Sequence, residues 1–506
     1  MPTPISGNNI YLTAGLPEFK LLFHDKGIRV DKKEGTSILV EGSAGLGKTT
    51  FALQISTQAV QEGCSSCLYF SFDQTSSEIS DMIGSFKFFS RDIKPVCFSW
   101  SDEINTLNPS IEFNIIDCHK TSDITVSQTI DKIRKYTEHF AQHNKSPILI
   151  VLDSIGAIKD LKSLEREHVK RLIEELREYH VVLILVSEQY DPFETATTEY
   201  LTNIVFELKK LSPKEGELLW TDFPRTVFEI VKTRNQPAYR GPHEFEVFSV
   251  LNRSLESKSY NTKNMGGIVI YPSLKSVASS SRQLSNRAEI NGMRATFGIE
   301  DLDRWLGGEK SDPENPSMGI AYGQSILLTG DPGNYKTELG IQFLKQGLID
   351  SPDQRVLFVS CKIEEAALDR VTIFEDTEQR CLFHDRLEFI DVRIPFRTLS
   401  TVMSTIRNVI EIKNSSQINR AVIFGIGMLE TLPMFQRKAL PFLQVLLNYF
   451  ANVGIASILI DWPQPKDIST SAFAKDLVSA SISVKKSEKN IENEECNMFK
   501  GRDCNT

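Results

Sequence analysis

Residues 42–50 read Gly42-Ser43-Ala44-Gly45-Leu46-Gly47-Lys48-Thr49-Thr50, a glycine-rich segment that ends in a lysine and two threonines. A short apolar run at 38–40 precedes it, and an apolar helical pattern begins at Phe51. In this order of strand, glycine-rich loop and helix, the pattern G-x-x-x-x-G-K-[ST] forms a P-loop. The glycines let backbone N–H groups turn toward an anion, Lys48 reaches the β and γ phosphates, and the Thr49 hydroxyl ligates Mg2+. We therefore predict an ATP site at residues 42–50 rather than an ordinary glycine turn.

The second half of the chain repeats this pattern. Gly330-Asp-Pro-Gly333-Asn-Tyr335-Lys336-Thr337 again follows an apolar run and leads into a helical pattern. Continuous apolar runs separated by helical segments such as 163–180 are typical of buried parallel strands with crossover helices. Three more such runs follow each loop, at 67–72, 147–152 and 181–186, and at 355–360, 421–424 and 456–460. The predicted fold class is α/β, with two tandem P-loop domains, each a mostly parallel twisted sheet flanked by helices.

The boundary between the two predicted domains lies in a polar, serine-rich segment without apolar periodicity, which favours a linker. We expect a first domain at 1–272 with an intact P-loop, a linker at 273–291, and a second domain at 292–506 with a degenerate nucleotide site.

Two further side chains of the first half stand where parallel strands end. The third apolar run ends at Asp153, where a carboxylate can hold Mg2+ at the carboxyl edge of a sheet. The alternative interpretation of Asp153 is a simple strand-end cap. The fourth run ends at Ser187, where a polar group can sense the γ-phosphate or cap a loop.

These motifs together resemble the KaiC branch of the RecA-type ATPases. The resemblance rests on the P-loop, on Phe72-Asp73-Gln74, Leu152-Asp153-Ser154 and Ser187-Glu188, and on Glu229-Ile-Val-Lys232-Thr-Arg234 followed by Tyr239-Arg-Gly. It covers nearly all of the first half and most of the second. It implies two stacked RecA-like domains and six subunits in a double ring, with ATP bound between neighbours.

The same resemblance gives Lys232 and Arg234 a role. In the family, the Lys-x-Arg strand of one subunit reaches the phosphates that the next subunit binds, and its positive charge neutralises the transferring phosphoryl group. The alternative is two exposed charges on an edge strand.

The candidate catalytic acid departs from the family. The family carries adjacent glutamates just past the second strand, and the matching residues here are Asp73 and Gln74. Asp73 can still polarise the attacking water, but its side chain is one methylene shorter, and such a displacement costs rate. We expect slow hydrolysis.

The second site has lost several parts. Gly330, Gly333, Lys336 and Thr337 remain, but Tyr335 replaces the glycine that permits close approach to phosphate. Comparison of the third runs places Gly425 opposite Asp153. A gapless comparison past the second run places Lys362 and Ile363 opposite Asp73 and Gln74, whereas a shift by two places Glu364 and Glu365 there. We prefer the gapless comparison because the strand lengths then match, and we expect a structural or regulatory copy.

Two weaker signals lie near the C-terminus. Lys500-Gly-Arg502 repeats the Lys-x-Arg spacing, and Ser469-Thr470-Ser471 lies in the region that the second domain phosphorylates in KaiC clock proteins. With the second site so reduced, we expect a polar loop there rather than autokinase activity.

Composition limits the partners. The net charge of −9 argues against binding nucleic acid through bulk electrostatics, so this partner is not favoured. No stretch approaches the roughly 18 to 20 apolar residues that span a bilayer, and residues 1–17 lack the basic start and apolar core of a leader. We expect a cytoplasmic protein that binds no membrane.

The function that we expect is an ATP-binding, slowly hydrolysing ring, a homohexamer whose nucleotide state switches its interaction with a regulatory protein partner. One alternative is an accessory of DNA recombination or repair, which would need basic pore loops, whereas we find only scattered pairs such as Lys209-Lys210. Another is a non-catalytic scaffold in which ATP is structural.

Overall fold

The computed structural model describes most of the chain between residues 10 and 485. The described residues are 10–24, 26–31, 34–86, 88, 93–104, 108–119, 125–143, 147–158, 166–177, 179–188, 199–211, 225–248, 267–281, 294–307, 318–331, 333–362, 368, 377–393, 398–412, 418–432, 435, 438–461 and 474–485. Among the earlier expectations, those on 363–365, 469–471 and 500–502 lie outside these residues.

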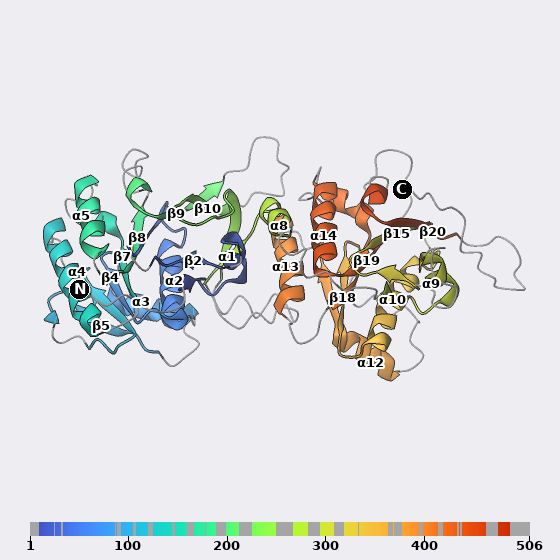
Figure 1. Ribbon diagram of the computed structural model, residues 1–506, viewed down its shortest axis with the longest axis horizontal. Coiled ribbons are helices and arrows are strands. Elements are labelled where there is room, and N and C mark those ends of the chain that lie inside the picture. The colour runs from blue at the N-terminus through green and yellow to red at the C-terminus, as the bar shows by residue number, and fades with distance from the viewer. Residues whose placement is uncertain are drawn as a thin grey trace, which may run out of the picture. The chain divides into compact units, whose positions relative to one another are not determined.

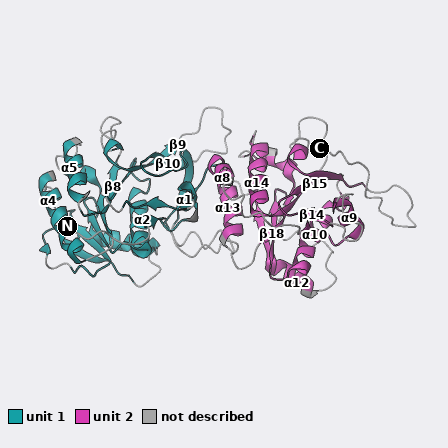
Figure 2. Cartoon of the chain, in the orientation of Figure 1, with its two compact units in different colours: residues 1–273 teal, residues 274–506 magenta. Residues whose placement is uncertain are grey.

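The chain divides into two compact units, residues 1–273 and 274–506 (Figure 2). Each has its own sheet and its own apolar cores, and the two are described separately. Both sheets are mostly parallel and flanked by helices, so the predicted α/β class is confirmed.

The first unit is built on one ten-stranded sheet (Figure 1). Seven neighbouring strands, β9, β3, β8, β7, β4, β6 and β5 in sheet order, are parallel to one another. Beyond β9 the sheet continues through β10, β11 and β12, each antiparallel to its neighbour. In sheet order the strands are β12 (Gly267–Tyr271), β11 (Pro242–Phe248), β10 (Arg225–Thr233), β9 (Ile204–Leu211), β3 (Thr36–Gly42), β8 (Val182–Glu188), β7 (Ile148–Asp153), β4 (Ser66–Ser71), β6 (Phe113–Asp117) and β5 (Val96–Ser99).

Helices cover both faces of this sheet. The central strands are apolar on both sides, as two-sided burial requires, and successive residues such as Ile38 and Leu39 enter different cores. One core includes α1 (Pro17–Leu22), α2 (Lys48–Glu62), α3 (Ser76–Phe86) and the antiparallel pair β1 (Tyr11–Leu12) with β2 (Ile28–Arg29). The other includes α4 (Val126–His143), the 3-10 turn η2 (Ile155–Ala157) and α5 (Arg166–Arg177).

The second unit has a six-stranded sheet in which every pair of neighbours is parallel. In sheet order the strands are β17 (Leu387–Asp391), β16 (Arg355–Ser360), β18 (Ile418–Phe424), β19 (Ala456–Ile460), β15 (Ser325–Thr329) and β20 (Ala480–Ser483). One core contains residues of α8 (Leu274–Ser281), α13 (Leu399–Ile412) and α14 (Ala439–Val453). The other contains residues of α9 (Glu300–Gly307), α10 (Lys336–Asp350), α12 (Thr377–Arg386) and the pair β13 (Arg294–Ala295) with β14 (Ile320–Ala321). Two 3-10 turns, η4 (Ile426–Thr431) and η6 (Lys475–Leu477), complete the unit.

Part of the predicted linker 273–291 is structured, which corrects that expectation. Residues 274–281 form helix α8, and Val277 is fully buried in the core that α14 shares. Leu274 packs against the same core. Because these two residues are three positions apart, they lie on one helix face, a pattern that the surrounding serines conceal in the sequence.

Among the described residues, no helix combines the length and the apolar character needed to cross a bilayer.

Candidate functional site

The glycine-rich loop of the first unit connects the end of β3 to the start of α2 at Lys48. Gly42 has a φ of 150°, and a Cβ there would lie 2.3 Å from the carbonyl oxygen of Leu208. Gly47, the residue before the helix, has a φ of 87°, in the left-handed region that glycine adopts without a Cβ clash. The loop therefore needs glycine at both positions for conformational reasons. It leads directly into the N-terminus of a fifteen-residue helix, where backbone N–H groups can bind an anion.

Lys48 extends over this loop and is the centre of the site. Its Nζ donates a hydrogen bond to the carbonyl oxygen of Ser43 at 3.0 Å and lies 3.8 Å from Oε1 of Glu188. Burial lowers the pKa of the Lys48 ammonium, and the carboxylates of Glu188, Asp153 and Asp73 oppose that shift. Three acidic side chains from three different strand ends therefore lie within electrostatic reach of the P-loop lysine.

Asp153 ends β7 and is almost fully buried. Its Oδ2 accepts a hydrogen bond of 2.5 Å from the Tyr69 hydroxyl, and its carboxylate also accepts one from the Thr49 hydroxyl. Burial raises the Asp153 pKa, and these two hydrogen bonds counteract the rise. The peptide bond that joins Asp153 to Ser154 is cis. The two predicted metal ligands, Thr49 and Asp153, thus lie in direct contact.

Asp73 follows β4, two residues beyond its last residue Ser71. The side chain is exposed enough to meet water, yet partial burial raises its pKa, as does the charge of Glu188. A hydrogen bond from Ser154 acts in the opposite direction. Asp73 is therefore a carboxylate at the open side of the site, beside both Lys48 and the residue that follows Asp153.

Magnesium fits this donor set. The ion prefers oxygen ligands in octahedral geometry and is usually held by one or two protein side chains together with phosphate and water. Thr49 and Asp153 supply such oxygens side by side. In the part of the chain that the structure describes, no three His, Cys, Asp or Glu side chains form a ready metal cage, so Mg2+ here would depend on bound phosphate.

The predicted sensor residue Ser187 and its neighbour Glu188 end β8. Glu41 pairs with Ser187 and Gly42 with Glu188, so both lie at the edge of the sheet where the loop begins. In the sequence, Glu188 is noticeable only as part of the Ser187-Glu188 motif, and its contact with Lys48 was not predicted. Its position directly after an apolar strand, on the same edge as Asp153, was the signal that could have identified it.

Lys232 and Arg234 lie toward the opposite edge of the same sheet. Lys232 pairs with Val205 on β9, and Val205 pairs with Leu39 on β3. Lys232 is therefore level with Leu39, which precedes Gly42 by three residues, or about 10 Å along the strand. The Arg234 N–H donates to the carbonyl oxygen of Asn203 at 2.9 Å. The structure therefore does not bring these two side chains to the P-loop of their own chain.

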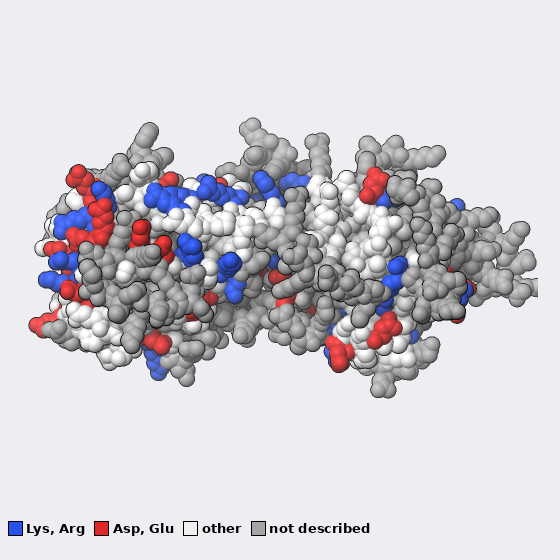
Figure 3. All heavy atoms as spheres, in the orientation of Figure 1, with Lys and Arg blue, Asp and Glu red and all other residues white. Residues whose placement is uncertain are grey.

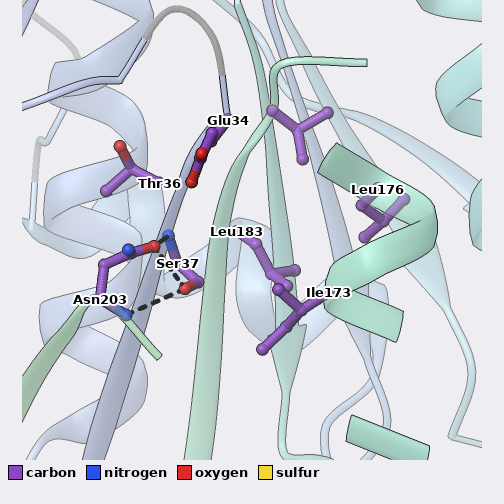
Figure 4. Close-up of a pocket in the computed structure, with 8 residues that line it drawn as sticks. Glu34, Thr36, Ser37, Ile173, Leu176, Leu183 and Asn203 are labelled. Carbon is purple, nitrogen blue, oxygen red and sulfur yellow. Dashed lines mark hydrogen bonds between the residues drawn. The ribbon is translucent and has the colours of Figure 1, made fainter. Parts of the chain in front are cut away.

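The start of β3 is tied to Asn203 by several hydrogen bonds. The Ser37 N–H and hydroxyl donate to Oδ1 of Asn203 at 2.8 Å and 2.7 Å, and the two residues face each other beside a small pocket (Figure 4). This pocket is lined on its other side by Ile173, Leu176 and Leu183. Because it adjoins the amino end of β3, it is separate from the nucleotide loop.

Backbone carbonyl groups at 199–202, just before β9, accept hydrogen bonds from the side chains of Lys232 and Arg234. Lys232 Nζ donates to the carbonyls of Glu199, Tyr200 and Thr202, the last two at 2.9 Å and 2.8 Å. Arg234 Nη2 donates to Tyr200 at 2.6 Å, and both charges lie over the exposed Tyr200 ring. Burial, reinforced by the charge of Arg234, lowers the Lys232 pKa to about 8.

The second unit forms a loop of the same shape at the end of β15. Gly330 has a φ of 155°, and Lys336 donates to the carbonyl of Asp331 at 2.8 Å, as Lys48 does to Ser43. Lys336 also donates to the carbonyl of Gly330. Tyr335 adopts the left-handed conformation of Gly47 with a φ of 55°, and it is 55% exposed. The tyrosine side chain is therefore accommodated at the surface.

The sheet register corrects one sequence comparison. The backbone N–H after β4, that of Phe72, donates to the carbonyl of Asp153, and the N–H after β16, that of Cys361, donates to the carbonyl of Phe424. Phe424 therefore takes the place of Asp153, and Gly425 takes the place of Ser154. The expectation that Gly425 lies opposite Asp153 was therefore wrong by one residue, because the sequence alone does not give the strand register.

The same register confirms the gapless comparison at its first position. Ser71 pairs with Asp153 and Ser360 pairs with Phe424, so the residue two beyond each strand is Asp73 in the first unit and Lys362 in the second. Lys362 is exposed, and its charge lowers the pKa of Lys336.

Asp461, which follows β19, is fully buried and accepts the Gly427 N–H at 3.1 Å.

Comparisons with known proteins agree with these arrangements. The family model of the KaiC ATPase matches residues 13–251 and 295–500. The chain is 24% identical over 343 residues to the circadian clock oscillator protein KaiC of Parathermosynechococcus lividus, covering 66% of this chain and 53% of that protein. It is 24% identical over 320 residues to circadian clock oscillator protein KaiC 1 of Synechocystis sp., covering 62% and 51%. With KaiC of Thermostichus vulcanus it shares 22% over 401 residues, covering 76% and 62%.

The chain spans about half the length of the first two of these relatives. The family matches extend over both units and include both glycine-rich loops. The chain therefore belongs to the KaiC ATPase family.

Proposed function

We propose that the first unit binds Mg-ATP and hydrolyses it slowly, and that this turnover acts as a nucleotide-dependent switch within a ring of identical subunits. The observation that carries the proposal is the convergence of Glu188, Asp153 and Asp73 on Lys48 at the end of β3. A buried lysine surrounded by carboxylates at a P-loop is suited to a polyphosphate that arrives with a divalent cation.

Each residue has a separate task in this proposal. The loop N–H groups and Lys48 bind the β and γ phosphates, and Thr49 and Asp153 hold Mg2+, which neutralises phosphate charge when it is bound. Ser187 lies on the same edge, and we assign it to sense the γ-phosphate. Asp73 accepts a hydrogen bond from the attacking water and orients it.

Slow turnover follows from the geometry of Asp73. Aspartate positions its carboxylate about one methylene short of a glutamate, and a displacement of about 1 Å can lower a rate by roughly 100-fold. Slow hydrolysis suits a switch because each nucleotide state then persists long enough to be read by a partner.

The proposal requires a second subunit to complete the site. Lys232 and Arg234 lie toward the amino edge of β3, away from the loop of their own chain. A ring in which this edge of one subunit meets the P-loop edge of the next would bring both cations to the bound phosphates. We propose a hexamer on the resemblance to KaiC, with a regulatory protein as the partner that reads the state of the ring.

Nucleic acid is a less suitable partner. The net charge is −9, and Figure 3 shows acidic and basic side chains interspersed on the visible end of the first unit that carries α4 and α5. On those two helices Arg171 lies 3.7 Å from Asp131 and 2.7 Å from Glu175. Charges that pair in this way leave little net field for phosphate backbones.

Steady-state ATP hydrolysis by the wild type and by Lys48→Ala, with light scattering on the same samples, tests the proposal. We expect turnover in the wild type that disappears in the variant. Wild-type protein that assembles with ATP but never hydrolyses it would contradict the proposal and would leave ATP as a structural ligand.

A further inference from the structure

The second unit keeps the parts of a nucleotide site that bind phosphate. The loop after β15 has the left-handed glycines Gly330 and Gly333, and a Cβ built at Gly333 meets no atom within 4 Å. Lys336 crosses the loop to the carbonyl of Asp331, as its counterpart crosses the first loop. Helix α10 then starts at Lys336 and runs for fifteen residues, so its N-terminal N–H groups face the loop.

Among the described residues of the same unit, the carboxylate that ends β7 in the first unit has no counterpart at the end of β18. The register places Phe424, buried and without any ligand atom, where Asp153 ends β7. Thr337 is thus left without the carboxylate that Thr49 contacts in the first unit. A Mg2+ ion needs oxygen ligands that are fixed in octahedral geometry, and one hydroxyl does not supply them. The described residues of this site therefore do not fit the metal.

A cation of the protein stands beside the loop instead. Lys362 occupies the place of Asp73, and its charge is felt by Lys336. A Cβ built on Gly425 would lie 3.1 Å from the Lys362 Cβ, so Lys362 leaves β16 directly beside the residue that follows Phe424. Replacing an acid by a lysine changes the local charge by two units in the direction that favours an anion without a counter-ion.

The acidic groups near Lys336 do not restore a metal site. Asp331, Asp461 and Glu338 act on the Lys336 charge. Asp461 is fully buried, and its Oδ1 accepts the Gly427 N–H. It follows β19, the strand that corresponds to β8, so it takes the position of Ser187 and not that of Asp153.

We propose that the second unit binds the polyphosphate of a nucleotide without a divalent metal, and that Lys362 provides the positive charge that Mg2+ provides in the first unit. The site then holds its ligand without hydrolysing it, because it has neither a base at position 362 nor a metal-bearing carboxylate at position 424. The inference concerns the second loop alone, and it stands or falls independently of turnover in the first unit.

Equilibrium dialysis of radiolabelled ATP with full-length Lys48→Ala protein tests the inference, since this variant leaves only the second loop to bind. Dialysis is run with excess Mg2+ and with excess EDTA. We expect one ATP per chain and an affinity that agrees within about 3-fold between the two buffers, since the charges that bind belong to the protein. Adding Lys336→Ala should abolish the binding.

The role of Lys362 is tested in the same Lys48→Ala background. Lys362→Glu should weaken binding in EDTA by about 10-fold or more, as loss of a charge-assisted contact predicts, while Lys362→Arg should retain most of the affinity. Because Lys362 is exposed, these variants should fold, which circular dichroism checks. Lys475→Glu is the matched control, since Lys475 is also exposed but precedes β20 at the amino edge of the sheet.

Three outcomes would overturn the inference. The first is ATP binding that requires Mg2+. The second is that Lys48→Ala binds no more ATP than the double variant Lys48→Ala, Lys336→Ala. The third is that Lys362→Glu leaves the affinity for ATP in EDTA unchanged. ATP hydrolysis by the wild type is measured beside these assays. If the wild type shows no ATP hydrolysis but the binding results are as expected, the function proposed for the first unit is refuted and the second-unit inference remains intact.

Discussion

The hydroxyl of Tyr69 donates a hydrogen bond of 2.5 Å to Oδ2 of Asp153, from one central strand to the next. Both residues are buried, and burial raises the pKa of the Tyr69 phenol well above its ordinary value, so the phenol keeps its proton and remains a donor. The bond also lowers the Asp153 pKa against the effect of burial. Tyr69 therefore both orients the carboxylate that faces Thr49 and favours its ionised form.

Tyr69→Phe should weaken the use of magnesium. Without this donor the Asp153 pKa rises further, and the carboxylate loses one restraint on its orientation. We expect the Mg2+ concentration at half-maximal ATPase rate to rise about 10-fold, which is the effect typical of losing a residue that supports a metal ligand. Tyr136→Phe, at another buried tyrosine, is the control and should leave this value unchanged. An unchanged Mg2+ requirement in Tyr69→Phe would contradict the role given to Tyr69.

Asp73 should determine the acid side of the pH–rate profile. Asp73 acts in its ionised form, and partial burial raises its pKa above the ordinary 3.8, so kcat should fall as the pH drops through that raised value. Asp73→Asn should lower kcat by about 100-fold or more and remove this acidic limb, while Asp73→Glu should remain active. Stopped assays over a pH series measure both effects. A limb that persists in Asp73→Asn would show that another group titrates.

Lys232 and Arg234 should act on the ATP of a neighbouring subunit. Lys48→Ala and Arg234→Ala proteins should each be inactive alone, because loss of such an arginine lowers kcat by about 10³-fold or more. Mixing and reassembling equal amounts should restore about a quarter of wild-type activity, since that fraction of interfaces pairs an intact loop with an intact arginine. A mixture with no more activity than its components would mean that the residues act within one chain or not at all.

Glu41, the residue before Gly42, should make the stability of the first unit depend on pH. Burial raises its pKa from 4.5 to about 8, with help from Glu199 and Glu207 and against the charge of Lys209. The folded state therefore keeps a proton that the unfolded chain loses above pH 4.5, and the free energy of unfolding falls as the pH rises from that value to about 8.

Glu41→Gln removes this loss. The gain in the free energy of unfolding over the wild type should be small near pH 5 and should grow by at most about 1.4 kcal/mol per pH unit up to pH 8, then level off. Differential scanning calorimetry of both proteins across this range provides the measurement. A difference that stays constant with pH would refute the assignment.

The sequence predicted the elements whose signals are local. The apolar runs ending at Asp153 and Ser187, and the helix that starts at Lys48, were readable because two-sided burial makes central strands continuously apolar. Strand β11 was not predicted, because it mixes polar and apolar residues, and β10 was expected only as the strand that carries Lys232. Helix α8 was missed because its serines, of which Ser276 and Ser280 are buried, conceal the apolar face that Leu274 and Val277 form.

The candidate site divides in the same way. The residues of the P-loop came from a motif, and Asp153 came from its place at a strand end. The contact of Glu188 with Lys48 and the bond from Tyr69 to Asp153 depend on which strands are neighbours, and a single sequence does not state this. The same information was needed to move the counterpart of Asp153 from Gly425 to Phe424.

The most direct test of the account is ATP hydrolysis by Lys48→Ala and by Lys336→Ala, measured in parallel with the wild type at saturating Mg2+. The two lysines hold equivalent places, 3.0 Å and 2.8 Å from the corresponding loop carbonyls, but only the first is surrounded by the acids of a magnesium site. We predict that Lys48→Ala abolishes turnover and that Lys336→Ala retains at least about half of it. Equal loss of activity in both variants would contradict the division of roles between the two units.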